Sequence, residues 1–198
     1  MILILILASV VQFFFGSLLY ARNTFLGRSR PNRMTFLIWA AGGLIGAGAA
    51  FAAGAKWVAL PAFASGIGPL LIFLASFHNP NAYWKLKATD YICGVFAVLA
   101  LILWVITKDP SVAVFFAILA DGLASLPTLI KSWKHPETET GVPYVLALLN
   151  AALGIYASGG LVFAKIGFIA YIIVINSCII LGVYRNEPLE KLKREVAR

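Results

Sequence analysis

The chain has 198 residues, of which 61% are apolar and 12% are charged, and its formal net charge is +8. Charged residues are about half as common as in an average soluble protein, and the mean hydropathy is strongly positive at +0.90. The apolar residues form several blocks of about 17 or more, long enough to cross a hydrocarbon core about 30 Å thick. This pattern excludes a soluble globular domain and predicts an all-α, polytopic membrane protein. The basic residues lie between the apolar blocks, as topology signals do, so the charge does not indicate a nucleic-acid partner.

Seven apolar blocks are predicted to be transmembrane helices. The first, MILILILASVVQFFFGSLLY, has no basic n-region and no small-residue cleavage site, so we interpret it as a retained helix rather than a signal peptide. The fourth and sixth are close to the minimum spanning length. The predicted spans are 2–20, 34–54, 57–77, 91–107, 110–130, 142–158 and 161–184.

Lysine and arginine are distributed very unequally between the two sides that these spans define. One side carries only Lys56, Lys108 and Lys165. The other carries Arg22, Arg28, Arg30, Arg33, Lys85, Lys87, Lys131, Lys134, Arg185, Lys191, Lys193, Arg194 and Arg198. This bias predicts a multi-pass cell-membrane protein with its N-terminus outside and its C-terminus in the cytoplasm. An interfacial aromatic belt is predicted for residues near span ends, namely Tyr20, Trp57, Tyr83, Trp84, Tyr91, Trp133, Tyr144 and Tyr184.

The chain also repeats its hydropathy and loop lengths. A shift of 108 residues places Thr35–Gly46 over Pro143–Gly154 and Arg22–Arg33 over Ile130–Gly141. An odd spacer helix makes the two three-helix units parallel in the membrane, which is one repeat geometry of secondary transporters. The predicted organisation is a first unit at 1–78, a linker helix at 79–109, a second unit at 110–184 and a basic cytoplasmic tail at 185–198. The tail is expected to form a short amphipathic helix that contacts membrane lipid.

A 3+1+3 layout, with a proline at the inner end of the fifth helix and a short basic loop after it, resembles the PQ-loop and SWEET transporter superfamily. The helix end that carries the resemblance is Leu126–Lys131, in which Pro-Thr stands where the family has Pro-Gln. The resemblance implies alternating access about proline hinges, for which Pro127 and Pro143 are the candidates. It also implies a substrate-binding asparagine on the last helix of a repeat, here Asn176, while Tyr156 stands near the place of the family's pocket tryptophan.

Asp121 lies about midway through the fifth span. An unpaired acid there costs at least about 2.5 kcal/mol and normally faces a protein or water-filled interior. It is therefore a candidate for proton coupling, and the alternative is a carboxyl group that only ties helices together. Gln12 lies at the middle of the first span, within one position of Asp121 under the repeat. It is a candidate ligand, or a hydrogen-bonded link between helices.

Three polar positions on consecutive helices of the second unit share one depth. Asn150 lies at midspan in the sixth span, and Asn176 with Ser177 lies slightly inside midspan in the seventh. Together with Asp121 these side chains predict a site for a polar solute, because donors and acceptors must replace the water that the solute loses. Trp39, in the second span, is a candidate gate residue, and the alternatives are a packing or interface residue and a platform for the ligand. The nearby Gly42, Gly46 and Gly48 predict close helix packing or sliding.

The polar loop KHPETETG carries Glu137 and Glu139, which we expect to be solvated or paired with Lys131 and Lys134; a cytoplasmic gate is the second interpretation. His78 and His135 are separated and lack further ligands, so no metal site or cofactor is predicted. The sequence contains no nucleophile beside a base, no phosphate-binding loop and no paired carboxylates within the spans. An enzyme is therefore not expected.

The resulting hypothesis is a carrier for a small polar solute such as a sugar, an amino acid or a vitamin, with either passive or proton-linked transport. A retinal-type sensor is one alternative, but it requires a lysine deep in the last helix and only the shallow Lys165 is present there. A non-transporting accessory membrane protein is the other. Two units in one chain do not need to dimerise to form a pathway, and the sequence leaves a homo-oligomer open.

Overall fold

The computed structural model of the chain describes residues 2–52, 59–78, 85–107, 110–157, 162–186 and 188–196. These residues form helices and loops, without a strand among them. The first helix is a continuous run of α1 (Ile2–Val11), the π-helical segment η1 (Gln12–Ser17) and α2 (Leu18–Phe25). The others are α3 (Arg33–Ala52), α4 (Ala59–Ala75), α5 (Ala88–Ile106), α6 (Pro110–Lys134), the 3₁₀ turn η3 (Pro136–Thr138), α7 (Val142–Ala157), α8 (Phe163–Tyr184) and α9 (Pro188–Val196).

The apolar blocks of the sequence coincide with the long helices. Three helical stretches are long and apolar enough to cross a membrane: Leu3–Phe25, Val114–Lys134 and Ile166–Tyr184. Shorter apolar helices cover Phe63–Ala75, Ala88–Leu99 and Val142–Tyr156. Large apolar side chains such as those of Phe15, Phe51 and Ile106 are mostly exposed on the outside of the bundle. A soluble monomer rarely exposes so much apolar surface, so this surface indicates a helical membrane protein.

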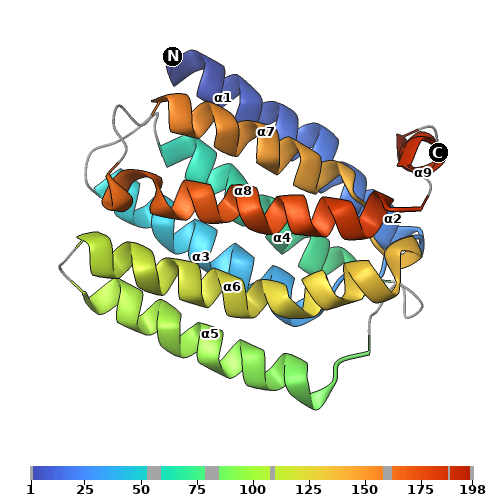
Figure 1. Cartoon of the computed structure of the whole chain (residues 1–198), viewed down its shortest axis with the longest axis horizontal. Coiled ribbons are helices and arrows are strands. Elements are labelled where there is room, and N and C mark those ends of the chain that lie inside the picture. The colour runs from blue at the N-terminus through green and yellow to red at the C-terminus, as the bar shows by residue number, and fades with distance from the viewer. Residues whose placement is uncertain are drawn as a thin grey trace.

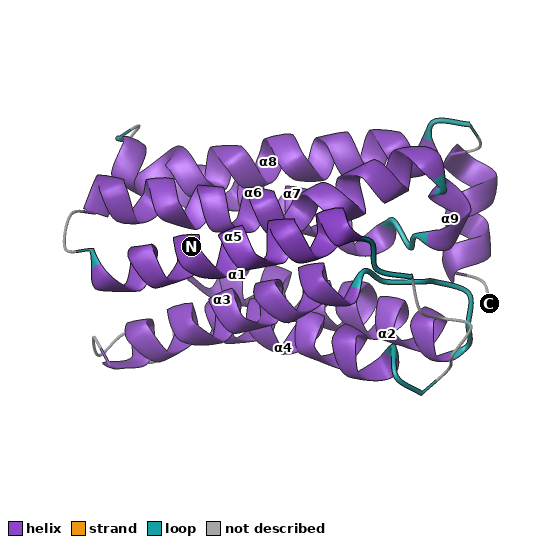
Figure 2. Cartoon of the chain, turned by 90° about the horizontal axis from the view of Figure 1, so that it is seen from below, coloured by secondary structure: helices purple, strands orange, loops and turns teal. Residues whose placement is uncertain are grey.

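Consecutive long helices run in alternating directions along the bundle (Figures 1 and 2). The loop at 26–32, the loop at 135–141 and α9 gather at the same end, where the C-terminus also lies (Figure 2). Hydrogen bonds join them there, since Arg30 N–H donates to the Thr138 carbonyl at 2.9 Å and Lys191 Nζ donates to the Pro136 carbonyl. We call this end the basic end. Lys56 and Lys108, expected at the opposite end, lie outside the described residues.

The long helices pack as two similar groups. In the N-terminal group, α4 packs against α3 and against the α1–α2 run; in the C-terminal group, α8 packs against α6 and α7. The third helix of each group is thus the one that contacts the other two. Between the groups, α1 and η1 contact α7, and α3 contacts α6. The first helix of each group therefore contacts the second helix of the other group. The remaining helix, α5, packs on α6 and α3.

A buried cluster joins the two groups near the basic end. Its members are Tyr20, Phe36, Ile72, Tyr144, Ile179 and Val183. The prediction that Tyr20 and Tyr144 belong to an interfacial belt is therefore wrong, because both rings are buried between helices. Tyr91 and Trp133 are about half exposed, as a belt requires, while Trp57, Tyr83 and Trp84 lie outside the described residues.

Candidate functional site

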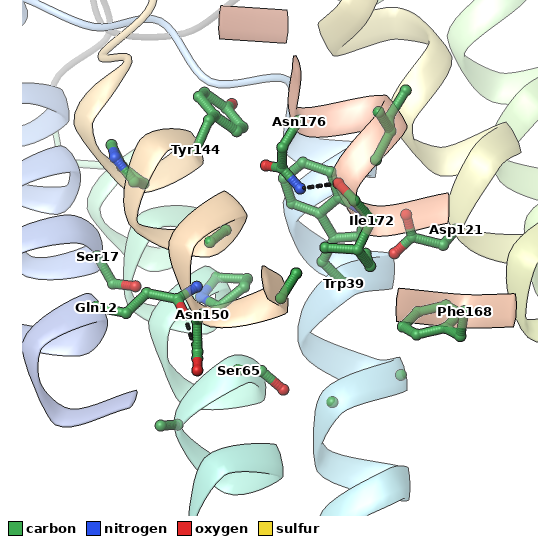
Figure 3. Close-up of a pocket in the computed structure, with 18 of the residues that line it drawn as sticks. Gln12, Ser17, Trp39, Ser65, Asp121, Tyr144, Asn150, Phe168, Ile172 and Asn176 are labelled. Carbon is green, nitrogen blue, oxygen red and sulfur yellow. Dashed lines mark hydrogen bonds between the residues drawn. The ribbon is translucent and has the colours of Figure 1, made fainter. Parts of the chain in front are cut away.

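A cavity of about 780 Å³ lies between the two helix groups. The α1–α2 run, α3, α4, α6, α7 and α8 all contribute lining residues, whereas no described side chain of α5 is among them. Most of the wall is aliphatic or aromatic, with a few polar side chains that point inward (Figure 3). A mostly apolar cavity with few convergent polar groups has the usual composition of a small-molecule site.

The structure brings most of the predicted site residues together. Asp121, Asn150 and Asn176 line this one cavity, as the shared depth of the three positions predicted. Figure 3 shows that they come from different helices and surround the same space. Three further predicted residues also line it, namely Gln12, Trp39 and Pro143.

Tyr156 and Ser177 do not line the cavity, so their prediction as lining residues is wrong. The Tyr156 side chain is 84% exposed on the outside of α7. An α-helix turns by about 100° per residue, so Tyr156 points about 120° away from Asn150 on the same helix. When Asn150 faces inward, Tyr156 must face outward. Ser177 is likewise rotated by about 100° from Asn176 and is absent from the lining.

Asp121 is held by a hydroxyl group from α8. Tyr171 donates its O–H to Asp121 Oδ2 at 2.7 Å. Ser125, one turn along α6, lies 3.1 Å from the same oxygen, but the shorter bond of its hydroxyl, at 2.7 Å, is to the Asp121 carbonyl. No described group donates to the other oxygen, Oδ1. These bonds tie α6 to α8 and fix the orientation of the carboxyl group. Tyr171 was not predicted, although a tyrosine at midspan near an intramembrane acid is a signal that would have found it.

The amide of Asn176 is held by its own helix. Its Nδ2 donates to the Ile172 carbonyl at 2.8 Å (Figure 3). Because a carbonyl oxygen can only accept, the nitrogen must face Ile172, and Oδ1 is left as an acceptor on the other side of the amide. No described group donates to this oxygen. Asn176 therefore offers an acceptor to whatever occupies the cavity.

Asn150 and Gln12 connect the two helix groups. Asn150 Nδ2 in α7 donates to Gln12 Oε1 in η1 at 2.8 Å, and it also lies 3.3 Å from Ser9 Oγ in α1. The interpretation of Gln12 as a link between helices is thus confirmed. Gln12 also starts the π-helical segment, in which Leu18 N–H donates to the Phe13 carbonyl five residues back. Single π-turns inside α-helices are frequent at functional sites.

Trp39 forms part of an aromatic wall. Its ring contacts Phe36 edge-on, with 5.3 Å between centroids, and it meets Tyr144 at 6.4 Å. The indole N–H is buried and has no acceptor among the described residues. An unsatisfied buried donor normally costs about 1–3 kcal/mol. Trp39 is therefore a packing residue that also carries an unused polar group beside the cavity.

The two prolines proposed as hinges occupy different positions. Pro127 is buried inside the continuous helix α6 and does not line the cavity. Thr35 in α3 donates its hydroxyl to the Ala124 carbonyl at 2.6 Å, one turn before this proline. Pro143 lies in the first turn of α7, where its missing N–H disrupts no helix bond. It therefore starts α7 and does not kink it.

The cavity is closed toward the basic end by a buried polar cluster, which we call the Glu139 cluster (Tyr20, Lys131, Glu139 and Tyr144). Tyr20 and Tyr144, which both line the cavity, donate their hydroxyls to Glu139 Oε2 at 2.6 Å and 3.2 Å. Lys131 pairs with Glu139 Oε1 at 2.5 Å, and the side chains of this pair are 1% and 0% exposed. The interpretation that Glu139 pairs with Lys131 is confirmed, whereas Glu137 is exposed and meets His135.

The loops on both sides of this cluster are bonded to each other. Asn23 Nδ2 donates to Thr140 Oγ1 at 3.2 Å, and Ser29 Oγ lies 2.5 Å from the same oxygen. Lys131 Nζ also donates to the Arg30 carbonyl. Residues that are more than 100 positions apart in the sequence therefore form one closed layer across the basic end.

The C-terminal helix α9 is fastened to this layer. Glu195 accepts hydrogen bonds from the backbone N–H groups of Gly141 and Val142 at 2.9 Å and 3.2 Å, and from the Tyr184 hydroxyl at 2.9 Å. Burial raises the pKa of Glu195 above its ordinary value, and the bond from the Gly141 N–H is the largest effect that opposes the rise. The expected amphipathic tail helix is thus present, but one of its two acidic residues, Glu195, docks on the protein.

Replacing Glu195 by alanine is expected to release α9 from the loop at 135–141. The Gly141 and Val142 amides lose a charged acceptor, which is typically worth about 1.5–3 kcal/mol, so their hydrogen exchange should accelerate about 10- to 100-fold. Hydrogen exchange with residue-level readout measures this effect. Glu190→Ala is the matched control, because Glu190 is exposed and pairs with Lys193 in the same helix. Equal exchange in both variants would contradict the docking role.

No protein-family model, no curated protein and no solved structure matches this chain.

Proposed function

We propose that this chain is a seven-span membrane carrier of the PQ-loop and SWEET type, which moves a small solute with polar groups by alternating access. The observation that carries the proposal is the placement of Asp121, Asn150 and Asn176 around one cavity between two similarly packed helix groups. Alternating access requires a site at the interface of two bodies that can rock against each other. The contacts of the α1–α2 run with α7, and of α3 with α6, form such an interface between the two groups.

The Glu139 cluster serves as the cytoplasmic gate of this carrier, in the orientation that the basic residues favour. Tyr20 and Tyr144 come from different groups and meet at one carboxylate, which lies on the loop that precedes α7. Separation of the two groups at this end must break these bonds and expose the Lys131–Glu139 pair to water. The described conformation is therefore one in which the inner side of the pathway is closed.

Transport is tested by reconstituting the full chain into liposomes and screening labelled sugars, amino acids, vitamins and amines for counterflow. Protein-dependent exchange of at least one solute class supports the carrier. Binding of a solute without any exchange, in vesicles where the protein is correctly folded, would favour an accessory or sensory role instead.

Replacing Asp121 by asparagine is expected to reduce the uptake of the transported solute about 10- to 100-fold, because a charged acceptor in the cavity is lost. Tyr171→Phe should reduce uptake less, since it removes one hydroxyl that positions the carboxyl group but keeps the charge. The matched control is Tyr156→Phe, which removes the same hydroxyl from an exposed ring. Initial rates of liposome uptake measure all three, and undiminished uptake by Asp121→Asn would remove Asp121 from the transport site.

A further inference from the structure

Asp121 and Asn176 each leave one acceptor oxygen open toward the cavity. The Tyr171 hydroxyl donates to Asp121 Oδ2, but Oδ1 has no donor among the described residues. Asn176 uses its N–H₂ group on the Ile172 carbonyl and leaves its oxygen unused. Both residues line the cavity, and Figure 3 shows the Asp121 carboxyl group directed toward the side on which Trp39 and Asn176 lie. A ligand that satisfies these two oxygens must bring N–H or O–H donors.

Charge restricts the ligand further. Among the described lining residues, Asp121 is the only acid, and there is no lysine, arginine or histidine. A ligand carboxylate or phosphate would thus enter an apolar space without a counter-charge and would lie close to a like charge, which is strongly unfavourable at low dielectric. A cation, in contrast, meets one acid that has no cationic partner. The lining therefore selects for positive charge and against negative charge, which also disfavours an amino-acid zwitterion.

The rest of the wall fits an apolar body. Trp39 and Phe168 line the cavity near Asp121 (Figure 3), and Ile169, Ile172 and Ile175 line the same part of α8. Aromatic faces attract cations and stack on rings. A sugar needs a hydrogen bond for each of many hydroxyls, and most of this wall offers none. The wall therefore favours a ligand with one polar end over one that is polar all round.

We infer that the cavity binds a small protonated amine with an apolar, ring-bearing body, whose ammonium group donates to Asp121 while its ring lies beside Trp39 and Phe168. This inference rests on the proposed function, because it names the solute class of the same cavity. It predicts a specificity that is set by the charge of the ligand and not by its size.

The test compares ligands of nearly the same shape on the purified full-length protein in lipid nanodiscs. The probes are 2-phenylethylamine, 2-phenylethanol and phenylacetate, with phenylalanine and glucose as representatives of the amino-acid and sugar classes. Competition against radiolabelled 2-phenylethylamine measures the affinities. The amine should bind about tenfold or more tightly than every other probe. Equal or tighter binding of the alcohol, the zwitterion or glucose overturns the inference, and this ranking needs no variant.

Variants then locate the amine. Asp121→Asn should abolish the preference for the amine over the alcohol, whereas Asp90→Asn should keep it, because Asp90 caps the start of α5 and lies outside the cavity lining. An undiminished preference in folded Asp121→Asn overturns the assignment. Tyr171→Phe should weaken amine binding more than alcohol binding, because it removes the hydroxyl that positions the Asp121 carboxylate. It serves as the second variant if Asp121→Asn does not fold. Counterflow of a neutral solute but not of the amine would reject this inference and leave the carrier standing. Amine binding without transport of any solute would support this inference and reject the carrier.

Discussion

Replacing Glu139 by alanine is expected to lower the free energy of unfolding by about 3–5 kcal/mol, because it leaves the buried Lys131 ammonium without its counter-charge. The side chains of Lys131 and Glu139 are 1% and 0% exposed, so water cannot solvate the Lys131 ammonium in the folded state once Glu139 is removed. Two tyrosine hydroxyls lose their acceptor in the same step. Thermal or denaturant unfolding of the protein in mixed micelles measures the loss.

Glu137 provides the matched control for Glu139, two residues away in the same loop. Its side chain is 69% exposed and lies 3.5 Å from His135, and an exposed pair of this kind contributes about 0–1 kcal/mol. Glu137→Ala should therefore unfold almost like the unchanged protein. Adding Lys131→Met to Glu139→Ala should restore part of the lost stability, because no unpaired charge remains buried. A loss in Glu139→Ala as small as that in Glu137→Ala would contradict the buried pair.

The same Glu139 variant tests the gate. Ala147 lines the cavity and offers a position for a cysteine after Cys93 and Cys178 are replaced by serine. A membrane-impermeant thiol reagent added at the basic end should label this cysteine slowly in the otherwise unchanged protein. It should label it faster in combination with Glu139→Ala, because the bonds that close the layer are gone. Equal labelling rates would mean that the Glu139 bonds stabilise the fold without controlling access to the cavity, and they would reject the gate.

The parts of this structure that the sequence predicts are those that depend on distance along one helix. Depth in a bundle follows from residue number, because an α-helix rises about 1.5 Å per residue. Asp121, Asn150 and Asn176 were therefore predicted to share a level, and they line one cavity. The direction in which a side chain points depends on which face of the helix packs. Tyr156 was placed by the resemblance alone, near the position of the family's pocket tryptophan, although the helical turn of about 100° per residue directs it away from Asn150.

The closed layer was harder to predict because its contacts join distant parts of the chain. Tyr20 and Glu139 are separated by 119 positions, and no local pattern pairs them. Each residue also had a simpler local interpretation, as an interfacial aromatic ring and as a loop acid. The docking of α9 was missed in the same way, because an amphipathic basic helix is typical of a membrane surface. Its one buried acid, Glu195, is recognised only when the amides of Gly141 and Val142 are seen beside it.

The closest approach of two helices in the N-terminal group also differs from its predicted place. The glycines at 42, 46 and 48 were expected to form a close-packing or sliding face. The tight contact instead lies at Gly43, where a Cβ atom would come within 2.6 Å of the backbone of Gly66 in α4. Gly42 and Gly46 line the cavity, and a Cβ atom on Gly48 would meet open space. In a membrane, small residues allow such backbone contact, and this contact fixes α3 to α4 as one body.

Replacing Gly43 by alanine is therefore expected to push α3 and α4 apart and to destabilise the protein by about 1–3 kcal/mol or more. The atoms that the new methyl group would meet belong to the backbone of Gly66 and Ser65, which cannot move aside as a flexible side chain can. Gly48→Ala, one turn further along the same helix, should instead be neutral or stabilising by up to about 1 kcal/mol, since alanine favours the helix and nothing obstructs it. Unfolding of both variants in the same micelles measures the difference. If Gly43→Ala were as stable as Gly48→Ala, the two helices would not be locked at this point, and the N-terminal group could not rock as a rigid unit around the cavity.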